Sequence, residues 1–409
     1  MNKVNLGELL EIKHGFAFKS ENYVDRSGYA LVTLANISAT NNFQFNIQKT
    51  TFYGSDFPED FILQEDDLIM PLTEQVVGLF GNSAFIPKVD GFKFVLNQRV
   101  GKVLPKEGKA DKYYLHYLLA TEAVKNQLEY RASGTRQRNI SPNDVYDVEV
   151  FVPDIEEQKR MGKCLYNIEE KINTNNKIND NLEQQAKLLY DYWFTQFDFP
   201  DENGKPYRTS GGKMVWNEQL KRDIPKGWEV KSLAEILQKN TDVFDYQSTQ
   251  PAVDLSIMPS NSIAISQLNS SDSFTTNLFA MKKGDILFGS IRPYLHKAGF
   301  APCDGVVAGT VHSFRVKNNQ DNNFALMTVS RDNFFNYAVN VSSGTKMPVV
   351  SSDSILDYKV PYNNKIARRY NEIPLIAIIS SHIQENQKLI SLRDWLLPML
   401  MNGQATISN

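Results

Sequence analysis

One short segment carries the residue types of a metal-dependent nuclease. The sequence P-D-I-E-E-Q-K (153–159) superficially resembles a Pro-Asp followed by Glu-x-Lys. In nucleases the aspartate and the Glu-x-Lys come from different strands and converge on a metal ion, whereas Asp154 and Glu157 lie only three residues apart. An aspartate that caps a helix and a glutamate in its first turn account better for this spacing. We therefore expect the start of a helix here and no nuclease site.

Other catalytic motifs are missing from the sequence. It contains no G-x-G and no P-P, so the Gly-rich cofactor loop and the N/D-P-P-Y type motif of a DNA methyltransferase are absent. It also lacks the G-x-x-x-x-G-K-[ST] loop of an ATP-driven motor. The histidines do not have the spacing of metal ligands, and we expect His296 and His312 to be structural. The sequence predicts no metal, no cofactor and no catalysis of its own.

The composition indicates an ordinary globular protein of more than one domain. A chain of 409 residues is too long for a single ordinary core and predicts two or three domains. Its two cysteines, Cys164 and Cys303, exclude a disulfide framework and a four-cysteine zinc site. No apolar run is long enough to span a membrane, and the N-terminus does not resemble a signal peptide. We expect a cytoplasmic protein.

The net charge of −3 hides two local basic regions. Residues 95–140 hold nine Lys or Arg and four Asp or Glu, and residues 282–300 hold four Lys or Arg and one Asp. A basic surface is the usual electrostatic mark of nucleic-acid binding. Basic regions balanced by acidic ones elsewhere suit a protein that grips DNA on one side and a protein partner on the other.

Three collinear matches indicate an internal repeat. NLGELLE (5–11) resembles SLAEILQ (232–238), EDDLIM (65–70) resembles KGDILF (283–288), and S-G-T occurs at 133–135 and at 343–345. In both halves a short polar segment, a strand-like run and a helix follow the S-G-T. Short runs rich in Val, Ile, Phe and Tyr, broken by Gly, Asn and Asp, predict the strands of a mixed sheet in each half.

Two long amphipathic helices follow the two repeats. Apolar residues recur at steps of three and four over 154–193 and again toward the C-terminus, which is the pattern of a heptad seam. A helix of about 40 residues needs a partner along its apolar stripe, so we predict that the two helices pair. Asn175 and Asn386 occupy corresponding positions of the seams, and a polar residue there fixes register. The other pairing residues are Leu165, Ile168, Ile172, Leu182, Ile379, Ile383, Ile390 and Leu397.

Two further expectations concern the ends of these helices. Pro374 fits the first turn of the C-terminal helix, and Pro398 should end or kink that helix. The segment 197–228 holds three prolines and four glycines with scattered charge, and we expect it to be an irregular connector rather than a strand or helix. Two ordinary amphipathic helices, each packed on its own domain, are the alternative to a paired seam.

These features together resemble the specificity subunits of Type I restriction–modification enzymes. The phrases that carry the likeness are GDILFGSIRPYLHKAGF (284–300), LNQRVGKV (96–103), NKINDNLEQQAKLLYDYWF (176–194), DIPKGWEV (223–230) and WLLPMLMNGQ (395–404). The likeness covers nearly the whole chain. The second copy lacks the Glu-Gln that follows the first strand, and the first copy lacks the leading Trp.

The resemblance implies an α+β fold. Two mixed α/β target-recognition domains, 1–153 and 229–362, would be separated by two long antiparallel coiled-coil helices, 154–196 and 363–409, with the connector at 197–228. It also implies a chain that reads a split site in double-stranded DNA and docks two methyltransferase (modification) subunits and the restriction subunits.

Several residues are candidates for contacting that DNA. Arginine and lysine side chains can bond to guanine and glutamine to adenine, while other basic groups only hold phosphate. Gly134 and Gly344 could allow close approach of DNA or could simply serve a turn, and Gln98 and Arg99 could read bases or close a strand. The remaining candidates are Thr135, Arg136, Gln137, Arg138, Arg292, Tyr294, Lys297, Thr345 and Lys346.

Two other functions stay open on the sequence alone. A helical scaffold or adaptor with repeated protein-binding domains would fit the acidic net charge slightly better. An enzyme that acts on nucleic acid is disfavoured by the missing motifs. The recognised bases cannot be deduced from the sequence.

Overall fold

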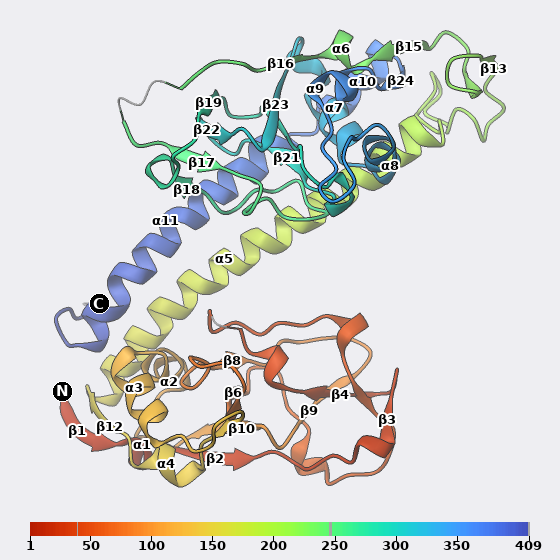
Figure 1. The fold of residues 1–409 in the computed structure, drawn as a ribbon. Helices are drawn as coiled ribbons and strands as arrows, with labels where there is room; N and C mark the ends of the chain where they lie inside the picture. The colour runs from red at the N-terminus through yellow and green to blue at the C-terminus, as the bar shows by residue number, and fades with distance from the viewer. Residues whose placement is uncertain (39, 245–247, 408–409) are drawn as a thin grey trace. The chain divides into compact units, whose positions relative to one another are not determined.

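The computed structural model describes residues 1–38, 40–244 and 248–407, and it divides into two compact units. Unit 1 comprises Met1–Glu170 and Leu389–Asn409, and unit 2 comprises Lys171–Lys388. The long helices α5 (Ile155–Tyr190) and α11 (Leu375–Met401) each begin in one unit and end in the other (Figure 1). The predicted limits of the recognition domains, 1–153 and 229–362, remain a prediction.

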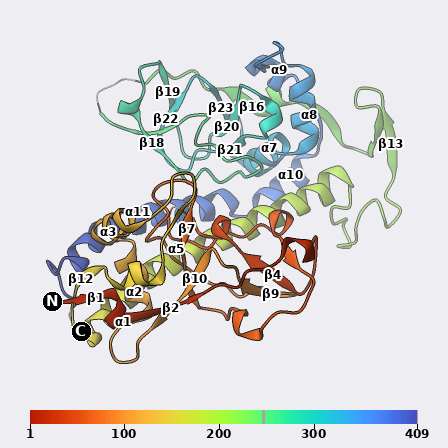
Figure 2. The same ribbon diagram turned by 60° about the horizontal axis from the view of Figure 1, so that its bottom comes forward.

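Two four-stranded sheets form the body of unit 1. The first has the order β2-β10-β6-β8 with antiparallel neighbours, and the second has the order β3-β5-β4-β9, in which β4 and β9 are parallel. Figure 2 labels the neighbours β2 and β10 of the first sheet and β4 and β9 of the second. The first sheet contains β2 (Leu10–His14), β10 (Val100–Pro105), β6 (Leu68–Pro71) and β8 (Ala84–Phe85). The second contains β3 (Tyr23–Val24), β5 (Phe52–Tyr53), β4 (Tyr29–Val32) and β9 (Lys93–Leu96).

Strand β6 joins two of the apolar cores of unit 1. Its four residues are all buried, and successive side chains of a strand point to opposite faces. Leu68 and Met70 accordingly enter the core beneath the helices, while Ile69 enters the core of the second sheet. This is why the sequence LIMP reads as a continuous apolar run rather than as an alternating one.

Short helices and strand pairs complete unit 1. Helix α2 begins after Asp111, whose carboxylate accepts a hydrogen bond from the Tyr114 N–H at 3.0 Å, as an N-cap residue does. The helices are α1 (Leu6–Leu9), α2 (Lys112–Leu119), α3 (Glu122–Arg131) and α4 (Pro142–Tyr146). The additional strand pairs are β1 (Asn2–Asn5) with β12 (Glu149–Val152) and β7 (Thr73–Glu74) with β11 (Arg138–Asn139).

Unit 2 repeats this plan. Its first sheet has the order β16-β23-β20-β21, from β16 (Leu237–Lys239), β23 (Val311–Val316), β20 (Ile286–Gly289) and β21 (Ala298–Phe300). Its second has the order β18-β17-β22-β19, from β18 (Asn269–Ser270), β17 (Pro251–Val253), β22 (Gly305–Ala308) and β19 (Leu278–Met281). Strand β15 (Glu229–Ser232) pairs with β24 (Lys359–Tyr362). The helices are α6 (Leu233–Ile236), α7 (Asn322–Val329), α8 (Asp332–Asn340), α9 (Ser352–Leu356) and α10 (Asn364–Asn371).

Backbone hydrogen bonds confirm the predicted internal repeat. In unit 1 the Leu6 N–H donates to the Val148 carbonyl, and at the corresponding place in unit 2 the Leu233 N–H donates to the Tyr358 carbonyl. The Lys106 N–H donates to the Leu9 carbonyl, and its counterpart is the Lys317 N–H, which donates to the Ile236 carbonyl. All four bonds are 2.8 Å long. A sequence match of a few residues can arise by chance. Matching long-range bonds cannot, because each requires two distant segments to meet in the same way.

The two long helices pack against each other in antiparallel fashion, as predicted. Within unit 2 the Asn175 amide donates to the Asn386 side-chain oxygen at 2.9 Å, and the side chains of Asn179 and His382 lie 2.8 Å apart. Asn175 is fully buried. Asn175 and Asn386 are the two polar seam residues that the heptad pattern placed at corresponding positions, and a buried polar pair of this kind fixes the register.

The rest of the seam is buried to different degrees. Leu165, Ile172, Ile379 and Ile383 are buried, and Ile168, Leu182 and Leu397 are partly buried. Ile390, by contrast, is 38% exposed, so its pairing role stays a prediction. Within unit 1 the end of α11 packs through Leu397, Leu400 and Met401 into the core that holds Met161 and Leu165.

Two local expectations about the helix ends and the connector need correction. Helix α11 continues through Pro398 and ends one turn later, at Met401, with the Asn402 N–H bonded to the Pro398 carbonyl at 3.0 Å. The connector is not wholly irregular, since β13 (Met214–Asn217) and β14 (Arg222–Pro225) form a two-stranded hairpin. Its prolines fall outside the strand interiors, where they remove no ladder hydrogen bond.

The described residues contain no helix that is both long enough and apolar enough to cross a membrane.

Candidate nucleic-acid interface

The S-G-T segment of unit 1 begins a closed loop. Two backbone hydrogen bonds between Ser133 and Asn139, of 3.0 and 2.8 Å, close residues 133–139 into a ring. Gly134 has φ of +109°, and a Cβ at this position would lie 2.2 Å from the Gln137 carbonyl oxygen. The turn by itself therefore requires glycine, which explains the repeated glycine of the motif without any ligand.

Unit 2 builds the same ring from different residues. Ser343 and Val349 exchange backbone hydrogen bonds of 2.9 and 2.8 Å, and Gly344 has φ of +98°. Here a Cβ would lie 3.1 Å from the Met347 carbonyl oxygen. The ring is thus a repeated scaffold, and the two units differ in the side chains that it presents.

A single residue in each unit links the ring to a second turn. In unit 1 the Leu72 N–H donates to the Arg99 carbonyl at 2.9 Å, and the Leu72 carbonyl accepts from the Ile140 N–H at 3.0 Å. The Gln98–Arg99 turn, between β9 and β10, therefore lies next to the ring. The equivalent bonds in unit 2 are Ser290 N–H to Thr310 C=O at 3.0 Å and Val350 N–H to Ser290 C=O at 2.9 Å. Gly309 and Thr310 thus stand where unit 1 has Gln98 and Arg99.

The predicted contact residues of unit 1 fall into two groups. Gln98, Arg99, Thr135 and Arg136 are exposed, so their side chains are accessible to a ligand. Gln137 is half-buried and donates to the Asn139 side chain at 3.3 Å.

Arg138 differs from its neighbours because its guanidinium is used inside the fold. It forms a 2.8 Å ion pair with Glu74, whose side chain is 1% exposed, and donates to the Glu129 carbonyl at 2.7 Å. The same carboxylate accepts backbone N–H groups from Leu79 at 2.9 Å and Phe80 at 3.3 Å. Nothing in the sequence around Glu74 pointed to this role, since the two residues are distant and meet only because β7 pairs with β11.

Unit 2 carries no such internal pair at the matching place. Arg292 occupies the position that Glu74 holds in unit 1, and Pro348 occupies that of Arg138. The Arg292 N–H bonds the Pro348 carbonyl at 2.8 Å, while its side chain is exposed. Arg292 has a left-handed backbone, with φ of +53°, which costs free energy in a residue other than glycine. The ring of unit 2 therefore adds an accessible cation where unit 1 has a buried anion.

The remaining predicted residues of unit 2 also fall into two groups, one exposed and one half-buried. Tyr294 is 51% exposed, and Lys346 and Thr345 are exposed. Lys297 is half-buried and donates from Nζ to the Leu255 carbonyl at 2.7 Å, so it stabilises the neighbouring loop. His296 stacks on Phe335 with ring centroids 4.3 Å apart, and half-buried His312 bonds the Val350 carbonyl at 2.9 Å. Burial lowers the pKa of His312, which keeps the ring neutral within the core.

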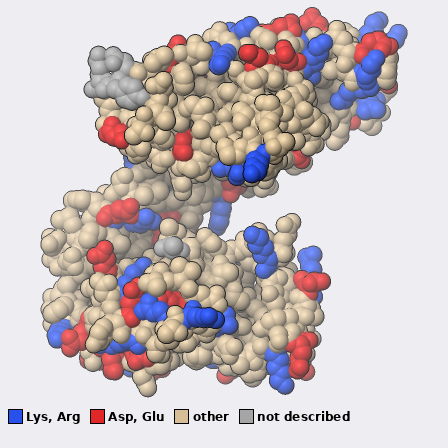
Figure 3. All heavy atoms as spheres, viewed as in Figure 1, with Lys and Arg blue, Asp and Glu red and all other residues tan. Residues whose placement is uncertain are grey.

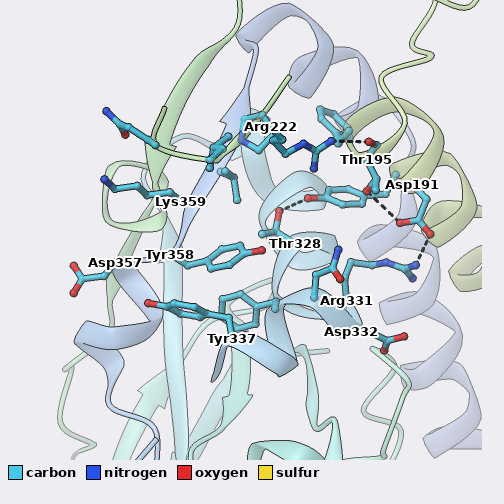
Figure 4. A pocket seen from close by; sticks show the side chains of 18 residues that line it. Asp191, Thr195, Arg222, Thr328, Arg331, Asp332, Tyr337, Asp357, Tyr358 and Lys359 are labelled. Carbon is cyan, nitrogen blue, oxygen red and sulfur yellow. Dashed lines mark hydrogen bonds and ion pairs between the residues drawn. The ribbon is translucent and has the colours of Figure 1, made fainter. Parts of the chain in front are cut away.

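A cavity of about 560 Å³ lies in unit 2 at the C-terminal end of α5 (Figure 4). Two of its three cations are engaged by neighbours: Arg331 forms an ion pair with Asp191, and Arg222 donates to the Thr195 carbonyl at 2.8 Å, while Lys359 is exposed at the rim. Burial, followed by the charge of Arg208, lowers the pKa of Arg222. These two arginines hold the helix end in place and are poorly suited to bind phosphate.

Unit 1 has a cavity of about 710 Å³ at the matching place. Thr121, Gln127 and Glu149 line it where unit 2 has Arg331, Tyr337 and Lys359. The location is thus a product of the repeated fold, whereas the chemistry of the lining is different in each unit. Such a pair of cavities does not point to one shared ligand.

The apparent nuclease motif is a helix cap. The Glu157 N–H donates to the Asp154 carboxylate at 2.9 Å at the start of α5, as expected from the sequence. Among the described residues, no group of three or more His, Cys, Asp or Glu side chains could hold a metal ion. On the face drawn in Figure 3, Lys and Arg atoms gather in small groups among Asp and Glu rather than in one continuous patch.

Comparison with known proteins gives a family match for the first part of the chain. Residues 1–184 match the sequence model described as the Type I restriction modification DNA specificity domain. The chain is 31% identical over 142 residues to the MjaIX specificity subunit of Methanocaldococcus jannaschii, covering 35% of this chain and 31% of that protein. It is 26% identical over 195 residues to the MjaVIII specificity subunit of the same organism, covering 47% and 45%. The match thus spans a third to a half of these two relatives.

Two further comparisons cover more of the chain. The EcoDI specificity subunit of Escherichia coli is 23% identical over 316 residues, which is 72% of this chain and 69% of that protein. The crystal structure of a Type I restriction–modification S subunit from M. genitalium has the same fold, with a TM-score of 0.59, 15% identity, and coverage of 98% of this chain and 96% of that one. Residues 1–184 thus match the Type I restriction–modification DNA specificity domain, and the chain as a whole is similar in sequence and fold to specificity (S) subunits. Specificity subunits are the non-catalytic members of these enzymes.

Proposed function

We propose that this chain reads a two-part sequence in double-stranded DNA for a Type I restriction–modification complex. The observation that carries the proposal is a repeated frame with different side chains. Both units have the glycine-dependent ring and the turn beside it, but one presents Gln98, Arg99 and Arg136 while the other presents Arg292, Tyr294 and Lys346. Two readers built on one scaffold would recognise two different half-sites.

The exposed groups have the chemistry for this task. Arginine can form bidentate bonds with guanine and glutamine with adenine in the major groove, and other cations bind phosphate. Thr135, Gln137, Lys297 and Thr345 belong to the same two surfaces and would act through backbone positioning or sugar and phosphate contacts. Arg138 would act indirectly, by fixing the ring of unit 1 through Glu74.

We further propose that two methyltransferase subunits bind, one for each repeat, and that restriction subunits join this core. A chain with an internal repeat offers two similar surfaces, which is the arrangement that two copies of one partner require. The paired helices α5 and α11 would set the separation of the two readers and hence the number of unread base pairs between the half-sites.

Methylation mapping tests this function directly. Cells that express the chain with its methyltransferase should methylate one split motif, and the purified complex should shift DNA that carries this motif at lower concentrations than DNA without it. A chain that assembles with the methyltransferase but leaves methylation unspecific would refute the proposal. Equal binding of protein partners with no preference for any DNA would favour the scaffold function instead.

A further inference from the structure

A polar hollow lies in unit 1 at the edge where its two parallel strands end. Val32 of β4 pairs with Leu96 of β9 in parallel register, so the chain leaves both strands on the same side, at Thr33 and Asn97. The hollow that opens beyond Thr33 has a volume of about 550 Å³. Its polar lining consists of Thr33, Asn36, Gln44, Asn46, Lys49, Thr50 and Thr51. The carboxyl ends of parallel strands are a frequent place for ligand sites.

The floor of this hollow is held rigidly. Asn36 is buried, its side-chain oxygen accepts the Thr33 N–H at 2.8 Å, and its amide donates to the Gln44 carbonyl at 2.9 Å. The Gln44 N–H in turn donates to the Asn36 carbonyl at 2.9 Å. On either side of Gln44, Phe43 and Phe45 pack on Phe94, with ring centroids 5.0 and 5.4 Å apart. The backbone that carries Gln44 is therefore fixed from both sides.

The rim of the hollow carries unused polar groups. The side chains of Gln44 and Lys49 are exposed, and among the described residues neither has a side-chain hydrogen bond or ion pair. A glutamine amide combines a donor and an acceptor in the geometry of the adenine N6 and N7 edge, while a lysine ammonium binds phosphate as a point charge. A free side-chain amide on a firmly held backbone, together with an exposed cation in the same hollow, has the composition of a base-reading site.

The hollow and the Gln98–Arg99 turn both follow the ends of the two parallel strands. Thr33 and Asn97 come directly after the paired residues Val32 and Leu96, and the Gln98–Arg99 turn, which adjoins the ring at 133–139, comes directly after Asn97.

The matching place in unit 2 is built differently. Asp254 follows strand β17 there, and its carboxylate bonds Ser256 and Asn269 at 2.7 to 3.1 Å. Both oxygens of this carboxylate are thus engaged by neighbouring residues. Two readers of different half-sites must differ where they touch bases, and the two units differ at this place while sharing their frame.

We propose that the hollow is a base-reading site of unit 1, in which Gln44 reads an adenine and Lys49 binds the adjoining phosphate. The inference rests on the proposed DNA-reading function and assigns it to a segment, 33–50, that the sequence patterns did not single out. The Gln44 amide would supply discrimination at one base pair of the half-site. Lys49 would add affinity without regard to sequence.

The test uses the full chain in complex with its methyltransferase subunits. The variants are Gln44→Ala and Lys49→Ala, with Gln48→Ala as a matched control, because Gln48 is an exposed glutamine of the same segment that does not line the hollow. Methylome sequencing reports the recognised motif. Titration of DNA that carries each single base change reports discrimination, and salt titration reports phosphate contacts.

Gln44→Ala should relax one A·T position of a single half-site, with a loss of discrimination on the order of tenfold to a hundredfold at that position. Lys49→Ala should weaken binding to all sequences and reduce the salt slope by about one. Gln48→Ala should change neither. If Gln44→Ala proves unstable, Gln44→Glu keeps the size of the side chain and should move the preference at that position toward cytosine, which donates to a carboxylate.

The failure of this inference is distinguishable from a failure of the proposed function. A wild-type complex that reads a split motif, together with Gln44 variants that read the same motif with unchanged discrimination, overturns the hollow as a reading site and leaves the general function intact. A wild-type complex without any sequence preference overturns the function itself.

Discussion

Arg136 and Arg138 lie two residues apart in one loop, but the structure gives them opposite tasks. Arg138 neutralises Glu74, whose side chain is 1% exposed, across 2.8 Å. Arg136 is exposed, and the described residues offer it no ion pair. Replacement of each by alanine should therefore affect different measurements, one the stability of unit 1 and the other the binding of DNA.

The size of the Arg138→Ala effect follows from the burial of its partner. Removal of one member of a buried ion pair costs about 3–5 kcal/mol, because the other charge remains buried without compensation. We expect the lower end, about 3 kcal/mol, since Glu74 keeps its hydrogen bonds from two backbone N–H groups. For a unit of this size each kcal/mol shifts the melting temperature by about 2–4 °C, so the transition of unit 1 should fall by roughly 6–12 °C.

The assay combines thermal unfolding with DNA binding at several salt concentrations. Arg136→Ala should leave the unfolding transition in place and lower the salt slope by about one, the value for one lost phosphate contact. A second substitution, Glu74→Gln in the Arg138→Ala background, removes the uncompensated charge and should restore much of the lost stability. Arg138→Ala with an unchanged transition and an altered recognition motif would refute the reasoning and make Arg138 a base reader.

The remaining predictions concern the length of the two helices, the exchange of one recognition domain and the stability at acidic pH. Insertion of seven residues after both Glu170 and Lys388 keeps the apolar stripes in phase, lengthens each helix by about 10 Å and should add about three base pairs to the spacer at 3.4 Å each. Methylome sequencing of an active variant with an unchanged spacer would contradict the role of the helices as a ruler. Exchange of residues 1–153 for the equivalent domain of a relative should change one half-site only, and a change in both halves would count against separate readers. Burial opposes ionisation of Glu169, but hydrogen bonding and the charge of His116, with the Tyr117 hydroxyl, lower its pKa. The ionised Glu169 contributes fully to the free energy of unfolding above the unfolded pKa of about 4.3, and this contribution is lost as the pH falls through the lower folded pKa. Glu169→Gln should therefore make the free energy of unfolding depend less steeply on pH below about pH 4.

The sequence determined those features that depend on periodicity and on local chemistry. Steps of three and four predicted two long helices that need each other, because a stripe of apolar residues on a helix must be covered. The cap at Asp154 was likewise visible, since it requires only neighbours along the chain. The internal repeat could be found because short matches in the same order survive even when the residues between them change.

Tertiary structure alone decided which polar side chains are free to meet a ligand. Arg136 and Arg138 look alike in the sequence, and only the pairing of β7 with β11 brings Glu74 to one of them. The hollow around Gln44 was hidden for a related reason: its lining residues lie close together in the chain, but Gln44 is held in place only because Phe43 and Phe45 pack on Phe94 of β9. Periodicity shows which face of an element is buried. The long-range pairing of strands decides which polar groups find partners inside the fold and which remain exposed, and no local pattern contains that information.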